Sequence, residues 1–251
     1  MTRNLLLAAV AVLALSTGAA QAAPSKEVVA AVADAGRPEV DTKRDADRKP
    51  AEMLEFAGIK PGQTVADFLP GGGYFTRIFS KAVGSKGVVY AVINAPPATP
   101  APDAKPNPIL AVAADANYPN IKVVQGNFQT LALPTQADVI WTSQNYHDLH
   151  LARFNLDVAA VNKAVYAALK PGGVYIVLDH AALAGAPLDT ADKLHRIDPA
   201  IVKSELAAAG FKYEGESTLL RNTTDDHTKG VFDPTLRGHT DQFIYEFRKP
   251  K

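Results

Sequence analysis

The chain has 251 residues, enough for one large domain with a buried core. Its 26 basic and 26 acidic residues cancel, so its net charge gives no reason to expect binding to nucleic acid or to an anionic membrane. The chain contains no cysteine, which excludes disulfides, thiolate metal sites and a cysteine nucleophile.

The first 22 residues have the order of features that a secretory signal peptide requires. Arg3 supplies a positive charge, residues 5–15 are an apolar run, and Ala20-Gln21-Ala22 is a small-x-small cleavage site. The apolar run is shorter than the ~20 residues of a membrane-spanning helix. We therefore expect cleavage after Ala22, no stable membrane insertion afterwards, and a periplasmic or secreted mature protein. An uncleaved buried helix is the alternative.

Helical patterns come first in the remaining chain. Residues 25–35 are predicted as a short helix, and residues 50–57 as a helix that begins at a proline. We expect residues 23–49 to form an N-terminal helical lid segment. Residues 50–251 are expected to form a single domain.

Strands and helices then alternate along the chain. Strands are predicted at 64–69, 87–93, 121–125, 137–142, 174–179, 211–217 and 242–248. The helices between them are predicted at 74–83, 109–117, 155–169 and 198–209. Alternation indicates a parallel sheet covered on both faces, and the last two strands, which have no helix between them, indicate an antiparallel hairpin at one edge. Residues 95–108 contain six prolines and are predicted as an irregular loop.

A glycine-rich turn follows the first predicted strand. Residues 65–75, VADFLPGGGYF, run from a buried strand through an acidic residue and a glycine turn into a helix. Open α/β sheets bind ligands at the carboxyl ends of their strands, and glycines let the backbone approach a ligand closely. A dinucleotide fingerprint needs a glycine where Thr76 stands, which disfavours a nicotinamide-dependent oxidoreductase.

The same segment resembles the first motif of the class I S-adenosylmethionine (SAM)-dependent methyltransferases. Residues 168–179, ALKPGGVYIVLD, are similar to that family's turn into its fifth strand, and residues 206–213, LAAAGFKY, resemble its passage from a helix to the sixth strand. The resemblance covers roughly residue 50 to the C-terminus. It implies an α/β fold with a Rossmann-like, doubly wound, seven-stranded and mostly parallel sheet that ends in an antiparallel hairpin.

The resemblance also implies SAM as the cofactor. Asp67, Gly71, Gly72 and Gly73 match the first motif and are expected beside the methionine part of SAM. The motif's first glycine is replaced by Leu69.

The nucleoside part of SAM is expected at the ends of the next strands. Asn94 replaces the acidic residue with which the family binds the ribose, and Asn127 stands where the family often has an aspartate near the adenine. Phe128 is expected to pack on the purine. Asn145, after the fourth strand, completes the predicted cofactor site.

The loop after the fourth strand carries the predicted catalytic residues Tyr146, His147 and Asp148. His147 or Asp148 is a candidate general base toward a hydroxyl or amine, with a polar loop or a helix cap as the alternative. His147, Asp148 and His150 are possible metal ligands by type, but their spacing places neither histidine on an obvious helix face. No metal site is predicted.

Further candidates lie at the same expected edge of the sheet. Asp179 and His180 end the fifth strand and are either site residues or a solvated strand end. His195 and Arg196 precede the next helix and are also candidates to face the cleft. Residues 44–48 are either a solvated charged face or part of a lid.

The sequence favours a methyltransferase that acts on an unidentified small-molecule acceptor, with no nucleic-acid partner. The alternative is an exported, non-catalytic ligand-binding protein on a methyltransferase scaffold. Two observations support the alternative: SAM is made in the cytoplasm, and Asn94 and Asn127 replace acidic residues.

Overall fold

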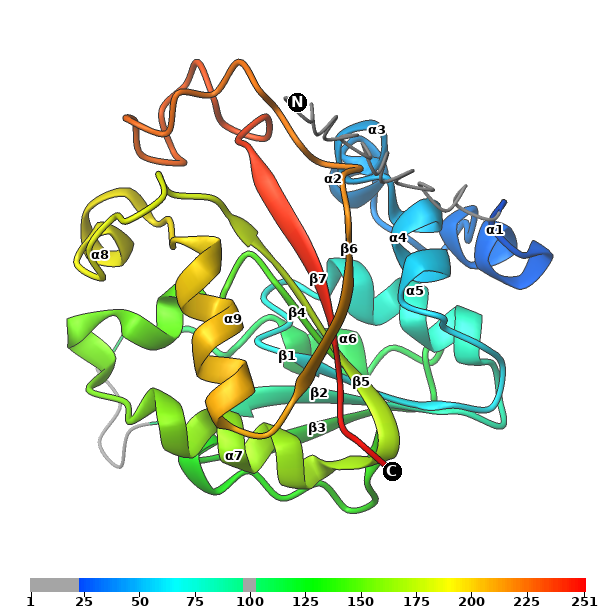
Figure 1. Cartoon of the computed structure of the whole chain (residues 1–251). Helices are drawn as coiled ribbons and strands as arrows, with labels where there is room; N and C mark the ends of the chain where they lie inside the picture. Colours follow the sequence, from blue (N-terminus) through cyan, green and yellow to red (C-terminus); the bar gives the residue numbers. More distant parts are fainter. Residues whose placement is uncertain (1–22, 97–102) are drawn as a thin grey trace, which may run out of the picture.

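The computed structural model describes residues 23–96 and 103–251 (Figure 1). The expected signal peptide lies outside the described residues, as does part of the proline-rich loop. Among the residues described, no helix combines the length and the apolar character needed to cross a membrane.

The described residues contain a seven-stranded sheet with the order β3-β2-β1-β4-β5-β7-β6. Its strands are β1 (Thr64–Phe68), β2 (Val88–Asn94), β3 (Ile121–Gly126), β4 (Ala137–Ser143), β5 (Leu169–His180), β6 (Lys212–Ser217) and β7 (Gln242–Arg248). The first five strands pair in parallel, and β7 lies antiparallel between β5 and β6. The predicted sheet and its C-terminal hairpin are confirmed.

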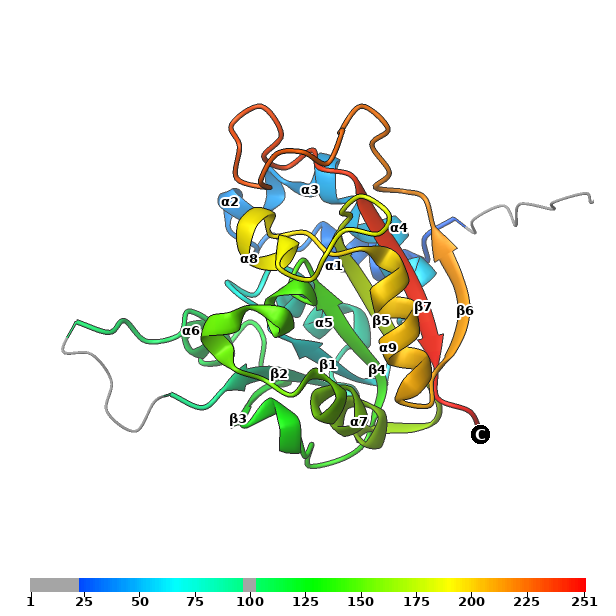
Figure 2. The same cartoon turned by 60° about the vertical axis from the view of Figure 1, so that its left-hand side comes forward.

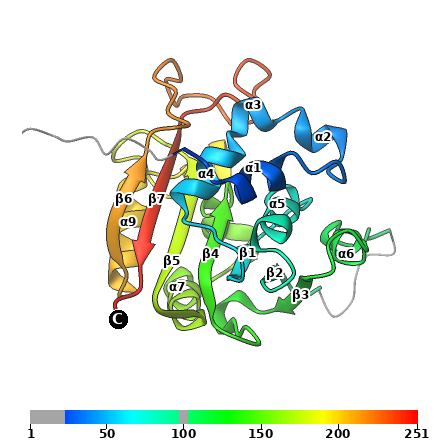
Figure 3. The same ribbon diagram turned by 90° about the vertical axis from the view of Figure 1, so that its right-hand side faces the viewer.

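Helices cover both faces of the sheet (Figures 1 and 3). They are α1 (Lys26–Val32), α2 (Glu39–Thr42), α3 (Asp45–Arg48), α4 (Pro50–Phe56), α5 (Tyr74–Val83), α6 (Ile109–Ala113), α7 (Val158–Ala168), α8 (Thr190–Leu194) and α9 (Pro199–Ala208). The described part of the chain also has three short 3-10 helices, η1 (Phe128–Thr130), η2 (His147–His150) and η3 (Ala152–Phe154). Helices α1, α4, α5 and α6 share one core, whereas α7 and α9 share the other.

Strand β1 shows how the two cores are separated. Because successive side chains on a strand point to opposite faces, Val65 joins the core with α5, and Ala66 and Phe68 join the core with α7 and α9. The same alternation turns Asp67 toward the α5 face, where it meets Thr76 of that helix. The pattern of β1 therefore fixes the direction of the acidic residue in the glycine-rich motif.

Several element boundaries differ from those expected. Helix α7 begins at Val158 and not at residue 155, because the Asp157 side chain caps it by accepting a hydrogen bond from the amide of Ala160 (3.0 Å). The Pro-Gly-Gly turn at 171–173 lies inside β5, where a register shift against β4 accommodates it. Helix α6 ends at Ala113, and α8 was not anticipated.

Candidate functional site

A pocket of about 420 Å³ lies at the carboxyl ends of β1, β4 and β5. Its walls come from the glycine turn, the segment after β4, the end of β5, helices α2 and α3, and the long loop between β6 and β7. Figure 2 shows α2, α3, α8 and this loop gathered at one end of the molecule. The volume is in the range of small-molecule sites, and the position is where open α/β sheets bind ligands.

The glycine turn forms the floor of the pocket. Gly71 and Gly72 line the pocket, and a Cβ atom on either would meet no atom within 4 Å. Gly73 instead packs against α6, because a Cβ there would lie 3.0 Å from Ile109 Cδ1. Leu69 has a φ of 63°, a left-handed conformation that glycine adopts at no steric cost. Leucine is therefore strained at the position where the resembling family carries glycine.

Asp67 lies under this turn and is almost completely buried. Its Oδ2 accepts a hydrogen bond from the Thr76 hydroxyl at 2.6 Å. Burial raises the pKa of Asp67 to about 7, although the bond from Thr76 and the charge of Arg48 act in the opposite direction. Asp67 therefore titrates near neutral pH in the folded protein.

This raised pKa predicts a pH dependence of folding. The unfolded chain loses the Asp67 proton near pH 4 and the folded chain near pH 7, so this residue lowers the free energy of unfolding as pH rises between those values. The effect is about 1.4 kcal/mol for each unit of pKa difference. We expect Asp67→Asn to gain stability relative to wild type as pH rises from 4 to 7, measured by urea unfolding. Identical pH slopes for both proteins would contradict this.

Arg48 enters the pocket from α3, in the segment that the sequence left as either a solvated face or part of a lid. Its guanidinium lies 4.4 Å from the centre of the Tyr74 ring and 4.7 Å from that of Phe75, and it donates to Ser143 Oγ at 2.8 Å. Burial lowers the pKa of Arg48 to about 10, so it stays charged at neutral pH. Arg44 also lines the pocket. Arg44 and Arg48 therefore belong to the site, whereas Ala46 and Asp47 between them are exposed.

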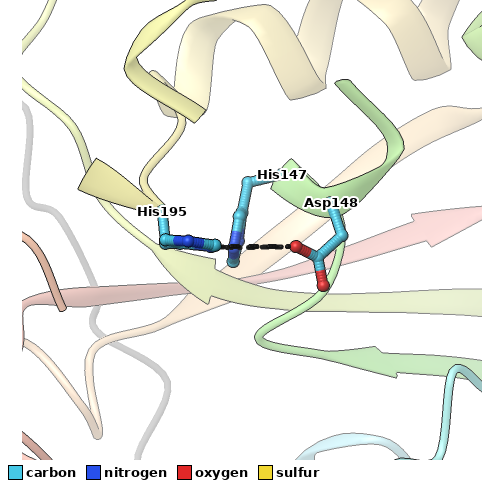
Figure 4. Close-up of side chains that lie close together, drawn as sticks. All are labelled: His147, Asp148 and His195. Carbon is cyan, nitrogen blue, oxygen red and sulfur yellow. Dashed lines mark hydrogen bonds and ion pairs between the residues drawn. The ribbon is translucent and has the colours of Figure 1, made fainter. Parts of the chain in front are cut away.

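His147 is held in the pocket wall by Asp179 at the end of β5. Its backbone amide donates to Asp179 Oδ2 (2.7 Å) and its Nδ1 to Asp179 Oδ1 (2.8 Å). Burial lowers the pKa of His147, but the Asp179 carboxylate outweighs this and leaves the pKa raised. The Nε2 atom of His147 faces His195 and Asp148 (Figure 4). The structure thus brings together two predicted catalytic residues with a histidine from the loop after α8.

Tyr146 does not fit its predicted catalytic role. Its ring is fully buried in the core beneath α7 and α9, and its hydroxyl donates to Glu205 and accepts from Asn162, both at 2.8 Å. These bonds hold the start of η2 in the core. Tyr146 therefore supports the loop that carries His147 and does not line the pocket.

The residues predicted to contact the nucleoside part of SAM do not line this pocket. Phe128 is buried, with its ring 4.7 Å from that of Phe68, so it packs in the core and not on a purine. The amide oxygen of Asn127 accepts from the Gln129 amide at 2.8 Å and caps η1. Asn94 is exposed at the end of β2, and neither asparagine lines the described pocket.

Some of the remaining candidate residues line the pocket, and one supports its wall from behind. His180 lines the pocket; its Nδ1 lies 2.7 Å from the Thr240 hydroxyl, and burial lowers its pKa to about 4. Asn145 also lines the pocket, and its amide donates to Leu69 O at 2.9 Å, which ties the glycine turn to the end of β4. Arg196 is fully buried behind the wall and anchors the β6–β7 loop.

No family model matches the chain. Its sequence is similar to those of curated C-methyltransferases. The ubiquinone/menaquinone biosynthesis C-methyltransferase UbiE of Legionella pneumophila (strain Corby) is 30% identical over 135 residues, which cover 50% of this chain and 46% of that protein. The protein of that name from Hydrogenovibrio crunogenus is 32% identical over 131 residues, covering 50% and 45%. This chain thus spans about half the length of the curated relatives it matches.

Solved structures resemble a larger part of the chain. A SAM-dependent methyltransferase from Aquifex aeolicus superposes with a TM-score of 0.58 at 18% identity, covering 84% of this chain and 95% of that one. An arsenic(III) S-adenosylmethionine methyltransferase from Chlamydomonas reinhardtii gives a TM-score of 0.55 at 20% identity, covering 91% and 75%. At these identities the likeness shows the fold, which is the one that the sequence motifs implied.

Proposed function

We propose that this chain, which has the fold of the class I SAM-dependent methyltransferases, binds SAM and transfers its methyl group to a small-molecule acceptor. The observation that carries the proposal is the pocket over Gly71 and Gly72 at the carboxyl ends of β1 and β4. When bound, SAM supplies a methyl group already activated by its sulfonium. The protein's part is then to align the acceptor with it and to exclude water.

The residues at the glycine turn fit the methionine part of SAM. An aminocarboxylate needs both positive charge and hydrogen-bond acceptors, and this side of the pocket offers Arg44 and Arg48 together with Asp67. Gly71 and Gly72 leave open space above the backbone, so a ligand can approach the turn closely. Both the charges and the space therefore suit this end of the cofactor.

The nucleoside part of SAM is proposed to extend along the ends of β2 and β3. Asn94 of β2 pairs in register with Gly126 of β3, which places Asn94 near Asn127. Both asparagines remain candidates for this part of SAM, although the amide oxygen of Asn127 already accepts one hydrogen bond.

The acceptor is proposed to bind at the part of the pocket that is lined by the segment after β4. There the wall is formed by His147, Asp148 and His195, with Phe232 from the β6–β7 loop. These groups suit a small molecule with a polar atom to be methylated or activated, beside an aromatic surface. We also retain the proposal that the mature protein acts in the periplasm or outside the cell after loss of residues 1–22.

Calorimetry with SAM and S-adenosylhomocysteine tests the cofactor assignment. We expect both to bind, and Arg48→Met to weaken binding by about 10- to 100-fold, because a charged hydrogen bond contributes roughly 1.5–3 kcal/mol. Lys170→Met is the control, since Lys170 pairs with Asp138 at the other end of β4. Circular dichroism establishes that the variants are folded. No binding by the wild-type protein at millimolar SAM would refute the proposal.

Turnover separates the enzyme from its alternative. Conversion of SAM to S-adenosylhomocysteine is measured across a panel of small acceptors from the cell envelope. Binding of SAM with methyl transfer to one acceptor supports the enzyme. Binding of an exported small molecule with no transfer at any SAM concentration favours the ligand-binding protein.

A further inference from the structure

We propose that His147, Asp148 and His195 bind one divalent transition-metal ion at the acceptor side of the pocket. The three possible ligand atoms are His147 Nε2, His195 Nδ1 and Asp148 Oδ1, which all lie within 4.8 Å of one another. They converge from two segments that are distant in sequence, the short helix η2 after β4 and the loop after α8 (Figure 4).

The separations of these atoms match those around a tetrahedral ion. Metal–ligand distances of about 2.0–2.1 Å with tetrahedral angles place ligand atoms about 3.3–3.5 Å apart. His147 Nε2 lies 3.3 Å from His195 Nδ1 and 3.4 Å from Asp148 Oδ1. The third separation, from His195 Nδ1 to Asp148 Oδ1, is 3.9 Å, and both side chains are partly exposed and free to make the small adjustment.

Asp179 prepares His147 for this role. Because the Asp179 carboxylate accepts the proton of His147 Nδ1, it fixes the tautomer in which Nε2 carries the free electron pair. Asp179 is completely buried and also accepts from the backbone amides of His147 and His180, so its own position is fixed. A buried carboxylate behind a ligating histidine is the usual outer support of a metal site.

The ligand set indicates the kind of ion. Two imidazoles and a carboxylate suit Zn²⁺ and neighbouring transition metals, whereas Mg²⁺ and Ca²⁺ prefer all-oxygen sites. Three protein ligands also leave a coordination position open, as in catalytic zinc sites. All three ligand residues line the pocket, so we assign that position to a polar atom of the ligand in the pocket. Only this last assignment rests on the proposed methyltransferase function.

No metal site is predicted from the sequence, because the third proposed ligand is distant from the other two in the chain. His147 and Asp148 are adjacent, and His150, the next histidine, pairs with Glu205 at 3.2 Å outside this cluster. His195 joins them because α8 packs beside η2 and ends at Leu194, so that His195, with a φ of 54°, follows as its C-cap.

The test uses metal ions alone and the full chain after treatment with a chelator. We expect one Co²⁺ per chain with a visible absorption band, displaced by Zn²⁺. His195→Ala and Asp148→Asn should each weaken Zn²⁺ binding by at least about 100-fold, and Asp179→Asn by roughly 10- to 100-fold. His150→Ala, in the same short helix, should bind as wild type. Circular dichroism shows whether each variant is folded.

Two results would overturn the metal site. One is the absence of a one-to-one complex with Co²⁺ or Zn²⁺ at micromolar concentrations. The other is wild-type affinity in both His195→Ala and Asp148→Asn, which would show that the metal binds elsewhere on the surface. Should any variant fail to fold, His195→Gln replaces it, because His195 is partly exposed and glutamine retains polarity without an imidazole. Neither SAM nor an acceptor is used, so failure here leaves the proposed function untouched.

Discussion

Replacing His147 by alanine is expected to lower methyl transfer by roughly 10²–10⁴-fold while leaving SAM affinity nearly unchanged. His147 lies in the acceptor wall of the pocket, with its Nδ1 2.8 Å from the buried Asp179 carboxylate. The change removes a proton carrier or, with the proposed metal ion bound, one of that ion's ligands, and loss of positioning alone costs about 10² in rate. Asp148→Asn should act in the same direction.

Steady-state rates with a true acceptor, together with calorimetry for SAM, test this expectation. His150→Ala is the matched control, because His150 belongs to the same short helix but bonds to Glu205 and does not line the pocket. Wild-type turnover by both His147→Ala and Asp148→Asn would refute the assignment of the catalytic loop. A large fall in SAM affinity would instead place these residues at the cofactor.

Arg196→Met is expected to lower the free energy of unfolding by about 3–5 kcal/mol, the usual effect of removing one partner of a buried ion pair. Arg196 and Asp225 are both buried, with Nη2 2.9 Å from Oδ2. The guanidinium also donates to the carbonyls of Ala181 and Lys229, both at 2.9 Å. Methionine leaves the Asp225 charge and two carbonyls without these partners.

Urea unfolding at neutral pH measures the loss. Lys43→Met is the control, since Lys43 pairs with Glu39 on the surface and such pairs contribute at most about 1 kcal/mol. If Arg196→Met does not fold, the double variant with Asp225→Leu should recover part of the stability, because no buried charge remains unpaired. A loss below about 1 kcal/mol in Arg196→Met would contradict the prediction.

This ion pair bears on the site as well as on stability. Arg196 holds the β6–β7 loop through Asp225 and Lys229, and the same loop contributes Val231 and Phe232 to the pocket. We therefore infer that Arg196 supports the part of the pocket wall that is proposed to face the acceptor.

The sequence by itself determined the order of the strands and helices along the chain, the C-terminal hairpin and the position of the glycine turn. Each of these features is encoded locally, because alternating and helical patterns report which residues face a core. Asp67 and Gly71 were predicted as site residues for the same reason: the end of a buried strand followed by glycines is visible in one short segment.

The tertiary structure alone decided which side chains share the pocket. The sequence offered Arg48 and His195 only as candidates, in a possible lid and before the helix that starts at Asp198, because no local pattern gives the direction of their side chains. Tyr146 and Phe128 were assigned to the site by their place after a strand, yet both turn into the core. A residue's position in the chain places its backbone at the sheet edge. The direction of its side chain then depends on the nearest cavity or hydrogen-bond partner, and these are supplied by elements remote in sequence.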